Sequence, residues 1–267
     1  MIAIDKNKCI GCGQCVRDCY PRDIILVDKK ANPLNDKCFE CGHCVAICPQ
    51  SAVTLLNYDM GEVEQLSDID YTIDPHTYLN HLKARRTIRR FKPTPLTDEE
   101  LSMILDAGRF SPTGGNRQDV AYYISRNDID TLRRLVLTKL NDMGNEMRQG
   151  NGALAWYGQR WLEMYDDYIS SGKDSVFFNA PTVIAVSSGS PQAACIAAAH
   201  METMIYALGL GMLYSGFSVR AVAQSDELKS FLKLKEGYSV YAMLVIGHPA
   251  VKYRRTVPRK PAEALFN

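Results

Sequence analysis

Eight of the nine cysteines in this chain of 267 residues lie between positions 9 and 48. They form two runs with the same Cys-x2-Cys-x2-Cys-x3-Cys spacing, and the second begins 29 residues after the first. Thiols clustered in a chain without an export signal favour metal ligation over disulfides, because cytosolic thiols are kept reduced. The two runs therefore predict metal centres, and their members are Cys9, Cys12, Cys15 and Cys19, then Cys38, Cys41, Cys44 and Cys48.

Two kinds of metal centre suit four thiolates. A structural zinc site is one, but zinc sites usually combine paired Cys-x2-Cys units. A third cysteine two residues on and a fourth after three more are typical of the bacterial ferredoxins that carry two 4Fe-4S clusters. Residues 1–57 resemble that family, with one departure: the second run continues Cys48-Pro49, whereas the first continues Cys19-Tyr20-Pro21.

The ferredoxin resemblance implies how the ligands are shared. In that family the fourth cysteine of each run ligates the cluster of the other run. The implied sets are Cys9, Cys12, Cys15 and Cys48 for one 4Fe-4S cluster, and Cys38, Cys41, Cys44 and Cys19 for the second.

A second group of chemically active residues begins with six cations in the ten residues 83–92. Such a run is often a solvated face or a nucleic-acid patch. Here it contains Arg85-Arg86-Thr87-x-Arg89 and is followed by a Pro-x-x-Asp helix start and by the loop Ser111–Gln118. These motifs, in this order, resemble the nitroreductase family of FMN-dependent flavoproteins over about residues 80–261. The family's usual Gln-Pro-Trp ending of the loop is Gln118-Asp119-Val120 here, a departure that bears on substrate preference.

The nitroreductase resemblance implies a set of FMN-binding residues. A phosphate group suits guanidinium groups with a hydroxyl donor, which the Arg85–Arg89 run supplies. The loop from Pro112 is expected to cover the flavin of a dimer partner, and a backbone N–H near residue 216 to face flavin N5. The basic tail either returns to the FMN phosphate or is exposed to solvent. The candidates are Arg85, Thr87 and Arg89, with Arg86 as a neighbour, then Pro112, Thr113, Gly114, Asn116, Ser215, Gly216, Arg255 and Arg259. No acid or base side chain is assigned to catalysis.

Several elements must position these residues. Thr97-Asp98-Glu99-Glu100 is a capping box that predicts a helix start, and Ser190 followed by Pro191 predicts a helix to residue 208. Apolar runs at 120–124, 182–186 and 238–246 predict the strands of an α+β sheet, antiparallel or mixed, flanked by helices.

The helix from Pro191 is apolar almost all round, which predicts burial on every side. In the family the corresponding helix forms a dimer core, so the resemblance implies a homodimer; the central helix of a monomer is the alternative. Cys195 and His200 on this helix are interpreted as packed residues. The aromatic segment 145–178 is either a cap over the flavin or part of the core.

Charge and hydropathy indicate the domain boundary and limit the classes of partner. Residues 61–80 contain five acids and no Lys or Arg, which predicts an acidic connector at 58–79 between a ferredoxin domain at 1–57 and a flavin domain at 80–267. A net charge of +1 argues against a nucleic-acid partner. No apolar run approaches the ~18 residues of a membrane span, so we expect a cytoplasmic protein and no membrane contact.

The two resemblances together imply a flavin oxidoreductase that takes electrons through two 4Fe-4S clusters to FMN. The expected acceptor is a nitroaromatic, quinone or activated alkene, and the expected donor is reduced ferredoxin or another low-potential carrier. The alternative is an electron-transfer or flavin-binding module whose acceptor is a protein partner.

Overall fold

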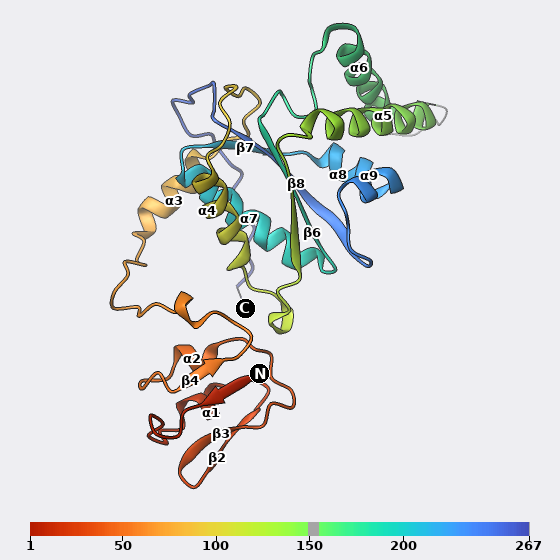
Figure 1. Cartoon of the computed structure of the whole chain (residues 1–267). Coiled ribbons are helices and arrows are strands. Elements are labelled where there is room, and N and C mark those ends of the chain that lie inside the picture. The colour runs from red at the N-terminus through yellow and green to blue at the C-terminus, as the bar shows by residue number, and fades with distance from the viewer. Residues whose placement is uncertain (149–154, 267) are drawn as a thin grey trace. The chain divides into compact units, whose positions relative to one another are not determined.

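The computed structural model describes residues 1–148 and 155–266 (Figure 1). The chain divides into two compact units. The first unit holds Met1–Ile73 together with the short segment Thr113–Arg117, and the second holds Asp74–Pro112 and the described residues from Gln118 onward.

The first unit is built on the internal repeat. Strand β1 (Ile2–Ile4) pairs antiparallel with β4 (Val53–Leu55), and β2 (Ile24–Val27) pairs antiparallel with β3 (Lys30–Pro33). Helix α1 (Gln14–Asp18) precedes β2 as α2 (His43–Ala46) precedes β4. Both helices start after a glycine in the left-handed region, Gly13 at φ 72° and Gly42 at φ 75°.

A chain segment with little packing follows the repeat. It contains the 3-10 turn η1 (Met60–Glu62) and leads to α3 (Pro75–Ala84), which has no buried residue. Asp74 starts α3 by accepting a hydrogen bond from the Thr77 N–H at 2.7 Å, and Pro75 occupies the first turn. Helix α3 therefore forms inside and beyond the stretch expected to be an acidic connector.

The second unit contains one four-stranded sheet in the order β5-β6-β8-β7, and every neighbouring pair is antiparallel. The strands are β5 (Val120–Ser125), β6 (Thr182–Ser188), β8 (Ser239–Gly247) and β7 (Gly211–Tyr214). The expected α+β sheet is confirmed. The sequence did not predict β7, because its four residues follow a glycine-rich helix end and resemble a turn.

Alternate residues of the sheet pack against two different helix layers (Figure 1). On β8, Ala242, Leu244 and Ile246 face the cluster that includes α4 (Asp98–Arg109) and α7 (Pro191–Ala207). Val240, Met243 and Val245 face the other cluster. That second layer is formed by α5 (Ile129–Arg148), α6 (Ala155–Ser171), α8 (Gly216–Ala223) and α9 (Asp226–Phe231). The predicted caps of α4 and α7 are both present, at Thr97 and Ser190.

Helix α7 differs from its prediction. Its face with Ala194, Ala197 and Met201 is buried in the single chain, but the opposite face is exposed, including Cys195, Ile196 and His200. The expectation that the helix is buried on every side is therefore wrong for one chain, as is the interpretation of Cys195 and His200 as packed. The exposed face combines apolar residues such as Ile196 and Ala199 with the polar Gln192 and His200. This contrast is weak, so sequence periodicity could not separate the two faces.

The aromatic segment contributes mainly to the core. Trp161 and Phe177 are fully buried in the layer that contains α5 and α6, whereas Trp156 is 60% exposed and stacks on Tyr157. The part of the predicted segment at 149–154 lies outside the described residues. Among the described helices, none is long and apolar enough to cross a membrane.

Candidate functional site

The eight clustered cysteines line two cavities in the first unit, four in each. One cavity is lined by Cys9, Cys12, Cys15 and Cys48, and the other by Cys19, Cys38, Cys41 and Cys44. These are the two sets that the ferredoxin resemblance implies, including the exchange of Cys19 and Cys48 between the runs. The described cysteines form no disulfides.

Backbone amides point at the sulfur atoms of both sets. Ala31 N–H donates to Cys9 Sγ at 3.4 Å, and Ala52 N–H donates to Cys48 Sγ at 3.3 Å. In the other set, Asp23 N–H donates to Cys19 Sγ and Glu40 N–H to Cys38 Sγ, each at 3.3 Å. Such donors stabilise thiolate ligands and the negative charge of a cluster. The donor set and the amides therefore fit two 4Fe-4S clusters, whereas the described residues contain no group of three His, Cys, Asp or Glu placed to hold a single metal ion.

The two cysteine sets differ in their electrostatic surroundings. The Ala31 N–H lowers the pKa of the Cys9 thiol, and Lys30 and Lys6 add to that effect. Burial raises the pKa of the Cys38 thiol, and the Asp23 carboxylate adds to that rise. The Met1 amino group acts on the pKa of Cys38 in the opposite direction. The first set therefore lies beside lysines, and the second beside a buried carboxylate and the N-terminal amino group.

A glycine allows the first cysteine loop to turn against β3. Gly11 has φ +71°, and a Cβ atom on it would lie 1.9 Å from the carbonyl oxygen of Lys29. No side chain fits at that distance, so the loop between Cys9 and Cys12 requires glycine at this position.

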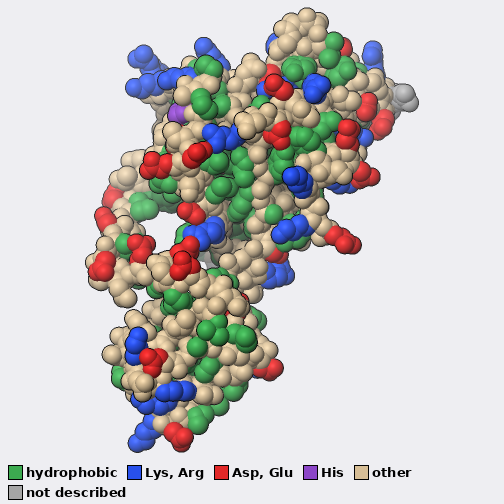
Figure 2. Space-filling model, in the orientation of Figure 1, with side chains coloured by type: hydrophobic (Ala, Val, Ile, Leu, Met, Phe, Trp, Pro, Cys, Tyr) green, Lys and Arg blue, Asp and Glu red, His purple; other side chains and the backbone are tan. Residues whose placement is uncertain are grey.

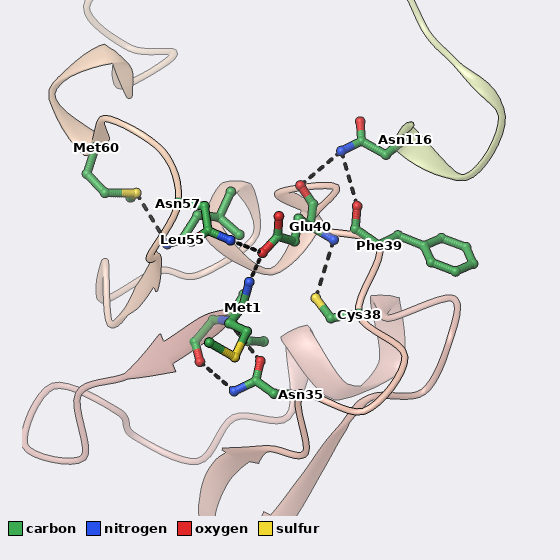
Figure 3. Close-up of polar contacts among 10 residues, drawn as sticks. Met1, Asn35, Cys38, Phe39, Glu40, Leu55, Asn57, Met60 and Asn116 are labelled. Atoms are coloured by element: carbon green, nitrogen blue, oxygen red, sulfur yellow. Dashed lines mark hydrogen bonds and ion pairs between the residues drawn. The ribbon is translucent and has the colours of Figure 1, made fainter. Parts of the chain in front are cut away.

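Figure 3 shows the polar contacts around the loop that holds Cys38. Glu40 accepts a hydrogen bond from Asn57 Nδ2 at 2.7 Å and forms an ion pair with the amino group of Met1. Asn116, in the segment that groups with the first unit, donates to the carbonyl oxygens of Phe39 and Glu40 at 3.2 and 3.0 Å.

The predicted phosphate-binding run lies beside β7 in the second unit. Ile88 N–H donates to the carbonyl oxygen of Met212 at 2.9 Å, and the Tyr206 hydroxyl donates to that of Arg86. Ile88 is buried against Gly211, where a Cβ atom would lie 2.6 Å from Ile88 Cγ1. This pairing places the segment from Arg85 to Arg89 alongside the strand that leads to Ser215 and Gly216.

The cations of that run have different partners. Arg85 Nη1 forms an ion pair with Glu202 Oε1 on α7 at 3.0 Å. Burial raises the pKa of Glu202, although Arg85 acts in the opposite direction. Across the described residues, no hydrogen bond or ion pair engages the side chains of Thr87 and Arg89, so both can bind an anion.

The start of α8 is open on one side. Ser215 is buried, and its hydroxyl lies 2.7 Å from that of Ser218 instead of capping the helix. A Cβ atom added to Gly216 would meet no heavy atom of the described residues within 4 Å. The free amides of the first turn and the space at Gly216 suit a flat, electron-accepting ring system.

The other predicted flavin contacts are divided between the two units. Pro112 belongs to the second unit, but Thr113, Gly114 and Asn116 group with the first. Arg255 and Arg259 lie in an exposed tail, and Arg259 Nη1 donates to the carbonyl oxygen of its neighbour Pro258. The roles of these residues toward a flavin remain predictions.

Three residues near the sites were not foreseen from the sequence. Glu202 and Tyr206 lie 117 and 120 residues from their partners in the arginine run, and no local motif signals them. Asp23 does carry a signal, because the internal repeat places an alanine, Ala52, at the equivalent position.

Comparison with known proteins decides the family. Residues 82–248 match the sequence model of the nitroreductase family. The chain belongs to the nitroreductase family. Residues 1–49 of this nitroreductase-family protein match the model of a 4Fe-4S dicluster domain. Both resemblances seen in the sequence are thereby confirmed, as is the enzyme class of oxidoreductase.

Individual relatives agree with this assignment. The chain is 29% identical over 191 residues to a NADPH-flavin oxidoreductase from Vibrio harveyi, covering 69% of this chain and 70% of the relative. An FMN-bound nitroreductase from Bacteroides fragilis shares 18% identity, with a TM-score of 0.53 over 70% of this chain and 98% of that one. A BluB-like flavoprotein from Clostridium difficile shares 16% identity, with a TM-score of 0.56 over 68% of this chain and 94% of that one. At these identities the two solved structures establish the nitroreductase fold.

Proposed function

We propose that this nitroreductase-family protein transfers electrons from two 4Fe-4S clusters to FMN and from FMN to a small organic acceptor such as a nitroaromatic, quinone or activated alkene. The observation that carries the proposal is the presence, in one chain, of two four-cysteine cavities and a nitroreductase domain. Clusters exchange single electrons, whereas a flavin accepts electrons singly or in pairs and can deliver a hydride.

The FMN phosphate would be held by the run beside β7. Within the described part of the chain nothing engages the side-chain donors of Arg89 and Thr87, and a phosphate of charge about −2 suits a guanidinium group with a hydroxyl donor. Arg85 would contribute as well, in competition with its ion pair to Glu202 at 3.0 Å. The isoalloxazine ring would lie against Gly216. Glycine has no side chain, so it leaves open the space that a flat ring would occupy there.

The chain supplies orientation and charge rather than a proton-transfer group. Ser215 is buried, and its backbone N–H is fixed by the carbonyl oxygen of Met243 at 2.8 Å, which holds the start of α8 in place. The amides of that first turn carry partial positive charge and stabilise negative charge that develops on a bound ring. Protons for the acceptor would come from solvent.

The proposed donor is a one-electron carrier such as reduced ferredoxin. A flavin domain alone can accept hydride from a nicotinamide, so attached clusters indicate a donor that delivers electrons one at a time. We also propose that the protein is a homodimer, because the exposed face of α7 presents Cys195, Ile196 and Ala199 to solvent in a single chain.

Anaerobic titration of the purified protein tests this function. Reduced ferredoxin and NADPH are added separately while cluster and flavin absorbance are followed, and a nitroaromatic is then supplied. We expect ferredoxin to reduce clusters and flavin, and the nitroaromatic to reoxidise both. Clusters that reduce without any flavin reduction, or a reduced flavin that only a protein acceptor reoxidises, would refute the enzymatic proposal.

A further inference from the structure

Asp23 occupies a position that the internal repeat fills with alanine. It follows Cys19 by four residues, as Ala52 follows Cys48. The backbones are equivalent, since the N–H of each residue donates to the sulfur of its cysteine at 3.3 Å. The two halves therefore differ at this place by one carboxylate group.

The Asp23 side chain is completely buried. Its Oδ1 atom accepts hydrogen bonds from the backbone N–H groups of Asp36 and Lys37, both at 3.1 Å. Its Oδ2 atom is buried and has no hydrogen-bond partner among the described residues. The Oδ1 atom thus holds the loop that leads into Cys38, whereas the Oδ2 atom makes no hydrogen bond to the described residues.

The other cysteine set has the opposite charge nearby. Lys30 Nζ donates to the carbonyl oxygen of Cys9, and Lys6 Nζ donates to that of Ala31, whose N–H faces Cys9 Sγ. Lys and Arg side chains, with an acidic side chain among them, are visible at the end of the first unit near the turn between β2 and β3 (Figure 2). Two lysines lie beside one set, whereas a buried carboxylate and the ion pair between the Met1 amino group and Glu40 lie beside the other, so the two sets are electrostatically unequal.

We propose that Asp23 is a redox-tuning residue, which holds the cluster of Cys19, Cys38, Cys41 and Cys44 at a lower reduction potential than the cluster of Cys9, Cys12, Cys15 and Cys48. Reduction adds one electron to an anionic cluster, and a buried carboxylate close to the ligands opposes that added charge. Lys30 and Lys6 favour the added charge at the other cluster. The first electron to enter the pair therefore resides on the cluster of Cys9. The inference rests on the proposed binding of two clusters.

The test is an anaerobic redox titration of the full-length protein, loaded with both clusters and followed by EPR. The parent should show two resolved midpoint potentials. In Asp23→Asn the lower midpoint should shift upward while the higher one stays in place, because asparagine keeps the Oδ1 acceptor and removes the charge. Asp36→Asn is the matched control: the same charge is removed from an exposed neighbour in the same loop, and both midpoints should stay close to their parent values.

Three results would overturn the inference: a single shared midpoint in the parent, no shift in Asp23→Asn, or equal shifts of both midpoints. The parent measurement decides the first of these even if Asp23→Asn fails to load its cluster. Iron analysis separates this inference from the proposed function. Iron far below eight atoms per chain would refute the two-cluster proposal, whereas eight irons with equal midpoints would refute only the role of Asp23.

Discussion

At the scale of single residues, the arginine run makes a direct prediction about cofactor affinity. Arg89 is exposed, and no residue of the described ranges 1–148 and 155–266 engages its guanidinium, so it can bind the FMN phosphate. Arg89→Ala should weaken FMN binding ten-fold to a hundred-fold, as expected for the loss of a charge-assisted contact of about 1.5–3 kcal/mol. Flavin fluorescence during titration of the apoprotein measures the change. Arg134→Ala on α5 is the control, and an equal loss in both variants would refute the assignment.

Glu202 leads to a prediction with a pH dependence. Burial raises the pKa of this carboxyl group, and its ionised form holds Arg85 at 3.0 Å. Glu202→Gln should bind FMN several-fold more tightly at pH 8, because it removes a negative charge near the phosphate and releases Arg85. As the pH falls through the raised pKa, the Glu202 carboxylate of the parent becomes protonated. The difference in FMN affinity between parent and variant should then shrink.

The dissociation constants of FMN from the Glu202→Gln variant and the parent, measured at pH 8 and at pH 5, test this sign. Weaker binding by the variant at pH 8 would instead show that the carboxylate orients Arg85 for the phosphate.

The cysteine sets could be predicted from the sequence because their spacing is local. The ion pair between Arg85 and Glu202 joins residues 117 positions apart, so no motif indicates it.

At the scale of elements, the loop between Cys9 and Cys12 is sterically constrained by β3 at Gly11. Gly11→Ala would place a Cβ atom 1.9 Å from the Lys29 carbonyl oxygen at φ +71°. The loop must then move, so we expect loss of the cluster of Cys9 and about half of the iron. Iron analysis and EPR of the variant measure this loss.

Gly172→Ala is the matched control for that experiment. It has the same φ of +71° but meets no atom within 4 Å, so it carries only the backbone strain of about 1 kcal/mol. Full iron content in Gly11→Ala would contradict the constraint.

Helices with capping residues and strands with a sustained apolar pattern were predicted correctly from the sequence. Thr97 and Ser190 marked two helix starts correctly, and the three longer strands were placed to within a few residues. Strand β7 was missed because it is short and obtains its strand geometry from pairing with β8, which is a tertiary interaction. The exposed side of α7 was missed because its few polar residues, such as Gln192 and His200, are interspersed with apolar ones.

At the scale of the whole molecule, the exposed face of α7 predicts association of two chains. Ile196 is 39% exposed at its centre, and Ile196→Glu should convert a dimer to a monomer, because a buried interface does not accommodate an unpaired charge. Light scattering after size-exclusion chromatography measures the mass. Ile169→Glu, on the 66% exposed Ile169 of α6, should leave the dimer intact. A monomeric parent would contradict the prediction.

The domain composition of the chain could be inferred from sequence almost entirely, because each part carries a dense local motif. The substrate could not, since the loop ending Gln118-Asp119-Val120 departs from the family pattern and acceptor choice depends on the shape of the assembled pocket.

The central claim is that electrons pass through the clusters to FMN. Its most direct test is anaerobic stopped-flow mixing of the full-length protein with reduced ferredoxin, with cluster and flavin absorbance followed separately. In the parent, cluster bleaching should precede flavin reduction. In Cys48→Ser, which removes a ligand from the cavity with Cys9, flavin reduction by ferredoxin should be strongly slowed while dithionite still reduces the flavin. Flavin reduction by ferredoxin at the same rate in both proteins would show that the clusters are not on the path.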